Sequence, residues 1–232
     1  MTYNHHTKFI SVALGQCIEA PAISIVERIM TRVNRPPNGR WVSSCRVNNY
    51  PKKFHIRHVE RLDMDTQYSD ILTRVKELYE APTLSANNNI KAIAFDVTGL
   101  GLPVWEMLRG SKVAKYINGV SITETGDVTH EISVGGIKLT APRVDIISSL
   151  QLAFQTGVIL IADMPGSDMF AQDLESLNKD PDVSGNTGVA LSVAIAVWLA
   201  SQPRSVTNEG CLGGWHDDTF CLWHPDDNEV YL

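Results

Sequence analysis

The clearest feature of the hydrophobic pattern is a short apolar run, residues 92–95, that leads directly into Asp96 and a glycine-rich turn. An uninterrupted apolar run of this length is typical of a strand buried on both faces. Pro103 and Gly110 bracket the next apolar stretch, which predicts a helix between them. An acid at the carboxyl end of a buried strand lies where open α/β sheets bind ligands and metals. An Asp in such a place also commonly stabilises a turn, so both interpretations stay open.

The first third of the chain predicts three strands joined as an antiparallel meander. Residues 8–15 (KFISVALG) and 22–30 (AISIVERIM) are apolar and rich in residues that favour strands. Residues 54–62 (FHIRHVERL) alternate, which would place Phe54, Ile56 and His58 on one face and His55, Arg57 and Val59 on a wetter one. The polar connection 31–51 reads as an extended loop or hairpin excursion.

The pattern then changes to helical spacing. Apolar residues recur at helical intervals within 68–80. The remaining pattern predicts, in order, a strand at 112–122, a hairpin at 127–140, a helix at 142–157, a strand at 158–162, and helices at 170–177 and 188–200.

Two of these helices have distinctive faces. The helix at 142–157 carries an apolar stripe made of Val144, Ile147, Leu150, Leu152 and Phe154. The helix at 188–200 is apolar nearly all round, which is typical of a buried helix. Large aromatic side chains on the predicted helices, Trp105, Trp198 and Phe154, are expected in the core rather than stacked on nucleic-acid bases.

Composition narrows the protein class. The 232 residues, with a formal net charge of −6, predict one domain with a possible tail and no overall basic surface. No apolar run is long enough to cross a bilayer, and the N-terminus lacks the core of a signal peptide, so a cytoplasmic protein is expected. Four scattered cysteines suit a reducing compartment. Cys211, His216, Cys221 and His224 lack a CxxC knuckle, and unpaired side chains are favoured over a zinc site.

The order of the predicted elements is that of the ribonuclease H-like fold. We therefore expect an α/β protein whose mixed central sheet, an antiparallel meander plus parallel strands, is flanked by helices. Such folds hold two divalent metals on carboxylates, and two metals about 4 Å apart can clamp the attacking and leaving oxygens of a phosphodiester. Oxygen ligands suit Mg²⁺ or Mn²⁺.

The chain resembles the nuclease domain of the large terminase subunit of tailed phages and prophages. The matching stretches are ALGQ, AISIVER, FHIRHVERL, TQYSDILTRV, FDVTGLGLPVWEML, APRVDIISSLQLAFQTGVILIA and ALSVAIAVWLA. They fall within residues 8–200, so we expect a terminase-nuclease-type domain at 1–201 and an irregular acidic tail at 202–232. No Walker-type GxxxxGK[ST] loop for a packaging ATPase appears.

The carboxylates depart from what the resemblance implies. The family carries Asp in the first strand, where this chain has Ala13, and His-Asp-Asp before the last apolar helix, where it has Asn186, Thr187 and Gly188. Asp96 alone is unchanged. Glu19 falls where the family often has another acid. Asp180 and Asp182, or His216-Asp217-Asp218 in the tail, are possible substitutes, and a solvated acidic turn is favoured for the tail motif.

The resemblance implies Asp96 and Glu19 as catalytic residues, with Asp182 completing a Mg²⁺ or Mn²⁺ site. Arg143 and Thr98 would contact nucleic acid, although a surface arginine is an equally ordinary interpretation of Arg143 and a turn role is favoured for Thr98.

Two functional hypotheses remain. One is a metal-dependent DNA endonuclease of genome packaging with impaired or lost catalysis. The alternative is a pseudonuclease that binds DNA or a packaging partner. The expected partners are double-stranded DNA and a packaging protein, which would be a separate ATPase, a small terminase or a portal protein. No membrane is expected, and the location would be the cytoplasm of a bacterial host.

Overall fold

Three strands from the N-terminal third form an antiparallel meander within the central sheet. Strand β1 (Thr2–Ala13) pairs with β2 (Ala22–Val33), and β2 pairs with β3 (Lys52–Arg61). The structure is a computed structural model that describes residues 2–15, 19–33, 52–82, 90–99, 101–109, 117–133, 136–177 and 187–202. The predicted meander is confirmed, and residues 31–33 extend β2 where a loop was predicted.

Parallel strands complete the sheet on both sides of the meander. Strand β4 (Ile90–Asp96) lies parallel to β1, and β5 (Ile117–Thr123) lies parallel to β4. Strand β7 (Gly136–Pro142) is parallel to β5 and forms the predicted hairpin with β6 (Thr129–Ser133). At the other edge, β8 (Ile159–Ile161) is parallel to β3.

The resulting strand order is β6-β7-β5-β4-β1-β2-β3-β8. Its central part, β3-β2-β1-β4-β5, combines an antiparallel meander with two parallel strands that follow a helix. This arrangement confirms the predicted ribonuclease H-like α/β fold.

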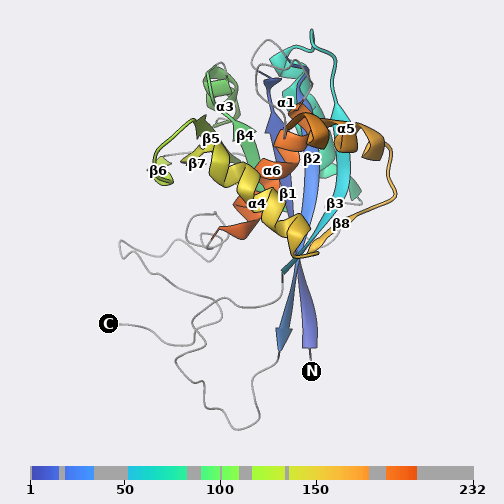
Figure 1. The fold of residues 1–232 in the computed structure, drawn as a ribbon. Helices are drawn as coiled ribbons and strands as arrows, with labels where there is room; N and C mark the ends of the chain where they lie inside the picture. The colour runs from blue at the N-terminus through green and yellow to red at the C-terminus, as the bar shows by residue number, and fades with distance from the viewer. Residues whose placement is uncertain are drawn as a thin grey trace.

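Helices cover both faces of the sheet (Figure 1). Helices α1 (Tyr68–Glu80) and α3 (Gly101–Arg109) pack on one face, in a core cluster with Ile10, Ile23 and Phe95. The other face carries α4 (Arg143–Gln155), α5 (Ser167–Leu177) and α6 (Gly188–Ser201). Helix α6 lies against β1 and β2, with α4 and α5 packed around it. This position explains why α6 is apolar on all sides, as predicted.

The predicted stripe of α4 is correct at Leu150 and wrong at Val144 and Leu152. Ile146, Leu150 and Ala153 form its buried face, whereas Val144 and Leu152 are more than half exposed. Phe154, predicted in the core, is 38% exposed and stacks at 6.5 Å on the buried Phe170 of α5. Because α4 is apolar on more than one side, its sequence pattern alone does not fix which side faces the sheet.

The predicted face of β3 changes part of the way along the strand. Phe54 and Ile56 are buried as predicted, but Val59 is buried too, and His58 is partly exposed. The pairing of β3 with β2 shifts between Ile25 and Val26, so the alternation of β3 skips one residue there.

Several element boundaries also differ from the prediction. Helix α3 begins two residues before Pro103, and α5 begins three residues before Phe170. Strand β5 is described only from Ile117. The four cysteines and residues 203–232 lie outside the described residues, so the predicted tail stays a prediction. Within the described residues, no helix is long and apolar enough to cross a membrane.

Candidate functional site

The carboxyl ends of β1 and β4 lie side by side, which brings Ala13 next to Asp96. The parallel register pairs Ser11 with Ala94 and Val12 with Phe95, and each strand ends at the following residue. Because side chains alternate along a strand, Ala13 and Asp96 share the face that α6 covers. Ala13 is 1% exposed and Asp96 is 4% exposed. The expected neighbour relationship of residues 13 and 96 is therefore present.

Asp96 is a buried carboxyl at the end of the central parallel strand. Burial raises its pKa, and the hydrogen bond from Thr98 and the positive charge of Arg143 oppose this rise. The backbone N–H of Thr98 donates to Asp96 Oδ1 at 2.9 Å. The Thr98 hydroxyl oxygen in turn accepts the N–H of Ile122 at 2.8 Å. Thr98 thus joins the turn after β4 to β5, which is the turn role weighed in the sequence analysis.

The turn after Asp96 requires glycine at two positions for different reasons. Gly99 has a φ of +60°, in the left-handed region that favours glycine. A Cβ at Gly101 would lie 2.0 Å from the carbonyl oxygen of Asp96, so the first residue of α3 has to be glycine. These two glycines fix the close approach of α3 to the end of β4.

Arg143 brings positive charge to the same end of the sheet. It is the first residue of α4, directly after Pro142, the N-cap residue at the end of β7. Its charge lowers the pKa of Asp96, so the two groups interact across the site. An anion bound here would meet the guanidinium group and the first amides of α4. The predicted phosphate contact of Arg143 stays a prediction.

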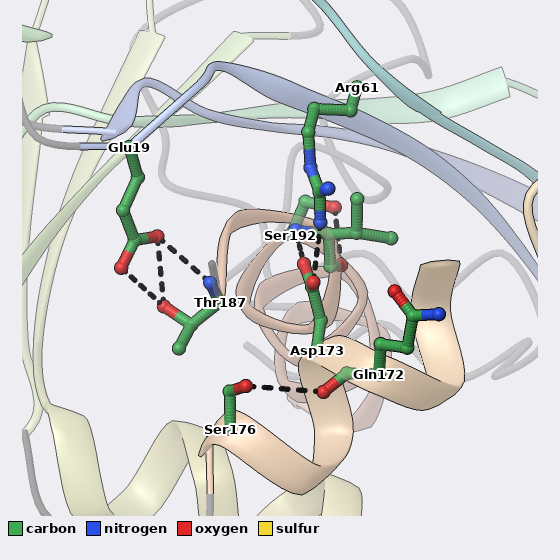
Figure 2. A network of polar contacts seen from close by, with 8 residues as sticks. Glu19, Arg61, Gln172, Asp173, Ser176, Thr187 and Ser192 are labelled. Carbon is green, nitrogen blue, oxygen red and sulfur yellow. Dashed lines mark hydrogen bonds and ion pairs between the residues drawn. The ribbon is translucent and has the colours of Figure 1, made fainter. Parts of the chain in front are cut away.

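Glu19 lies in the connection between β1 and β2 and binds the start of α6. Its Oε2 accepts the backbone N–H of Thr187 at 3.1 Å, and the Thr187 hydroxyl lies 3.0 Å from Oε1 and 2.9 Å from Oε2 (Figure 2). A carboxylate near a helix N-terminus is stabilising, because the first amides of a helix lack partners within the helix. In the structure this side chain caps a helix.

A second carboxylate, which the sequence analysis missed, also binds the start of α6. Asp173 of α5 is buried, and its Oδ2 accepts the N–H of Val189 at 2.8 Å. Its other oxygen forms an ion pair with Arg61 at the end of β3 (Figure 2). The spacing of Asp173 within its amphipathic helix was the available signal, since a buried acid on the core face needs partners.

The start of α6 packs tightly against the β1–β2 connection. A Cβ at Gly188 would lie 3.0 Å from the carbonyl oxygen of Ala20 and 3.5 Å from the Cβ of Ala22. Any side chain at this position would crowd backbone that cannot easily move. Gly188 therefore lets Thr187 and Val189 reach their two carboxylates.

The predicted metal site around Asp96 lies only partly within the described residues. Within those ranges, no group of three or more His, Cys, Asp or Glu side chains comes together. Asp96 alone would not supply the several oxygen ligands that Mg²⁺ or Mn²⁺ requires. Asp180, Asp182, Asn186 and the motif His216-Asp217-Asp218 lie outside the described residues. The predicted metal role of Asp182 stays a prediction.

No protein-family model matches the sequence, and no curated protein sequence matches it. The structure is similar to a human cytomegalovirus terminase nuclease domain that was soaked with Mn. The two chains are 12% identical, the TM-score is 0.47, and the match covers 84% of this chain and 82% of that chain. The ribonuclease H-like assignment accordingly rests on the strand order and connections given above.

Proposed function

We propose that this protein is a terminase-type nuclease-like domain of DNA packaging that binds double-stranded DNA and whose two-metal catalysis is impaired or lost. The observation that carries the proposal is that Ala13 and Asp96 end two adjacent strands, while the start of α6 packs against Ala22, the β2 partner of Ala13. Small, uncharged residues stand at position 13 and at position 188, where the phage family has carboxylates. Two-metal hydrolysis needs those oxygens to hold both ions.

DNA binding follows from what remains at this end of the sheet. Arg143 and the first turn of α4 provide a positively charged group and free amides beside Asp96. A guanidinium group pairs well with phosphate, because its donors match two oxygens at once. The site would hold a phosphate of the DNA backbone without cleaving it.

The binding experiment measures the affinity for a short duplex DNA by fluorescence anisotropy. Arg143→Gln should weaken binding about fivefold or more at low salt. The slope of log affinity against log salt concentration should fall by roughly the amount expected for one phosphate contact. Lys76→Gln, an exposed change on α1 across the sheet, is the control and should have little effect. Equal affinities of the two variants would remove Arg143 from the DNA site.

One observation favours the alternative, an active Mn²⁺- or Mg²⁺-dependent endonuclease. Asp96 remains ionisable at a buried position where burial raises its pKa. Perturbed carboxyls of this kind occur often at functional sites. In the alternative, Asp96 and Glu19 would act with a substitute acid such as Asp182.

Plasmid nicking with excess Mn²⁺ separates the two functions. The endonuclease would be established if the parent protein nicks the plasmid and Asp96→Asn abolishes the nicking. Asp163→Asn, an exposed change, is the control and should preserve it. The proposal predicts that the parent protein binds DNA but does not nick the plasmid with Mn²⁺ or Mg²⁺ at any pH tested.

A further inference from the structure

A cluster of basic side chains lies at the opposite end of the sheet from Asp96. Lys8 of β1 is paired with Glu27 of β2, and Glu27 is paired with His55 of β3. The next pairs on the same face join Ile29 to His6 and to Lys53. Together with Arg57, the five basic residues His6, Lys8, Lys53, His55 and Arg57 form what we name the β1–β3 basic cluster.

The one acid within this cluster is buried and already neutralised. Arg57 Nε donates to Glu27 Oε2 at 2.7 Å, and His6 Nδ1 lies 3.1 Å from Glu27 Oε1. The Glu27 side chain is 7% exposed, whereas those of Arg57 and His6 are 41% and 39% exposed. Solvent therefore meets the cations of the cluster and hardly meets its acid.

His55 lies among these charges. Burial lowers its pKa first, the positive charge of Arg57 lowers it further, Glu27 opposes this, and His6 and Lys53 make smaller contributions that lower it. Three permanent cations, Lys8, Lys53 and Arg57, stand beside the carboxylate of Glu27, and such a surplus attracts anions. The cluster thus has the charge balance of an anion-binding surface.

The amino-acid sequence is locally basic in this part of the chain. Residues 28–57 contain eight of the 20 lysines and arginines and none of the 26 acids of a chain whose net charge is −6. These residues include β2 from Arg28 onward and the first part of β3. A local basic stretch in an acidic chain is the usual electrostatic footprint of nucleic-acid binding.

The position of the cluster separates it from the Asp96 site. Glu27, Lys8 and His55 lie on the face that packs α1, whereas Asp96 faces α6. Strand β4 pairs with β1 only from Lys8 onward, so Thr2–Thr7 pair with β2 alone. Figure 1 shows these ends of β1 and β2 projecting from the body of the protein.

We propose that the β1–β3 basic cluster binds the phosphate backbone of double-stranded DNA as a second contact, separate from the Asp96 end of the sheet. This inference rests on the proposed function, since it assumes that DNA is the ligand. DNA is favoured over an acidic protein, because the stretch 28–57, which contains Lys53 and Arg57, carries eight lysines and arginines and no acid.

The test uses the unmodified protein and maps lysine acetylation by mass spectrometry with and without a duplex DNA. At about 50 mM salt, DNA should slow acetylation of Lys53 about threefold or more, and the protection should vanish at about 300 mM salt. Lys138 of β7, five strands away in the sheet order, is the internal control and should react equally in both samples.

Two variants provide an independent measurement. Lys53→Glu should weaken DNA binding about tenfold at low salt. It should also reduce the slope of log affinity against log salt concentration by about the amount of one phosphate contact, whereas Lys138→Glu should change neither quantity. Equal melting temperatures of the two variants would show that the difference is not a folding defect.

Each outcome decides between the two proposals. DNA binding without protection of Lys53, or with equal effects of the two variants, would overturn this inference and leave the proposed function standing. Absence of any DNA binding would overturn both. Equal protection of Lys53 by poly-L-glutamate at the same charge concentration would assign the cluster to acidic partners and overturn the inference.

Discussion

Glu19 and Thr187 stand 168 residues apart in the chain, yet three contacts of 2.9–3.1 Å join the Glu19 carboxylate to the amide and hydroxyl of Thr187. The sequence interpretation made Glu19 a metal ligand, whereas this geometry gives it a structural role at the start of α6. The two roles predict different behaviour when the charge is removed.

Glu19→Gln should lower the free energy of unfolding by about 1–2 kcal/mol, because one charged acceptor is lost while an oxygen remains. The rise in melting temperature on adding Mn²⁺ should be the same as in the parent protein, and Glu124→Gln, an exposed change, serves as control. A Mn²⁺ response that disappears only in Glu19→Gln would restore Glu19 to the metal site.

Asp173→Ala should be one of the most damaging single changes in the protein. It leaves the N–H of Val189 and the guanidinium group of Arg61 without their carboxylate partner, and breaking a buried pair costs about 3–5 kcal/mol. We expect the melting temperature to fall by about 10 °C. Glu175→Ala, on the exposed side of the same helix, should shift it by about 1 °C or less.

Asp96→Asn should stabilise the protein at neutral pH. Burial raises the pKa of Asp96 above its ordinary value of 3.8, so the folded state favours the protonated form. The stability that Asp96 contributes is complete below pH 3.8 and is lost as the pH rises through the pKa of the folded protein. The asparagine keeps an oxygen for the N–H of Thr98 without carrying a charge.

Thermal melts against pH check this expectation. The variant should melt about 2 °C or more above the parent protein at pH 7.5, and the difference should close as the pH falls to about 4. A parent protein that is the more stable at neutral pH would mean that the ionised carboxylate gains more from Arg143 and Thr98 than it loses through burial.

A rebuilt acidic site gives a metal-dependent prediction. Ala13→Asp combined with Thr187→Asp should be less stable than the parent without metal, because clustered carboxylates repel one another. Excess Mn²⁺ should reverse the loss, by about 2.7 kcal/mol at a hundredfold excess over the dissociation constant. The thermal shift on adding Mn²⁺ measures it, and equal shifts in parent and variant would mean that these positions do not converge on Asp96.

Position 188 is the less suitable place for the second acid. The sequence suggests that Gly188→Asp would be tolerated in a first helical turn, but its Cβ would lie 3.0 Å from the carbonyl oxygen of Ala20. We expect Gly188→Asp to cost about 1–3 kcal/mol through this crowding, whereas Thr187→Asp loses the hydroxyl contacts with Glu19 instead. A Gly188→Asp variant as stable as the parent protein would show that the β1–β2 connection can move aside.

Elements defined by local patterns were predictable, and their faces were less so. Helix α1 spans the predicted residues 68–80, because one apolar stripe and polar flanks define it. On α4, Val144 and Leu152 were predicted to be buried and are exposed, because the helix offers more than one apolar side. The register shift opposite Ile25 and Val26 has no cue in the sequence of β3 alone, so Val59 was placed on the wrong face.

The part of the candidate site that lies on strands could be predicted from the sequence. Asp96 at the end of a buried strand, with position 13 beside it, follows from the order of the elements. The partners of Asp173 and Glu19 could not be read in this way, because each contact joins segments distant in the chain and depends on how α6 packs. Long-range polar contacts of this kind are decided by tertiary packing, which leaves no local pattern.

Helix α6 carries buried charge at both of its ends, with carboxylates at its start and Arg28 of β2 donating to the carbonyl oxygen of Ala200 at 2.8 Å at its finish. Arg28 and Glu19 are synthesised long before the helix that they bind. A meander that folds during translation, before α6 is available, would have an uncovered apolar face and charged groups without the helix that they bind. Contacts between such distant segments form slowly. A nascent chain that stops before residue 187 would expose this face, and the ribosome-bound intermediate would then be the aggregation-prone stage in the life of the protein.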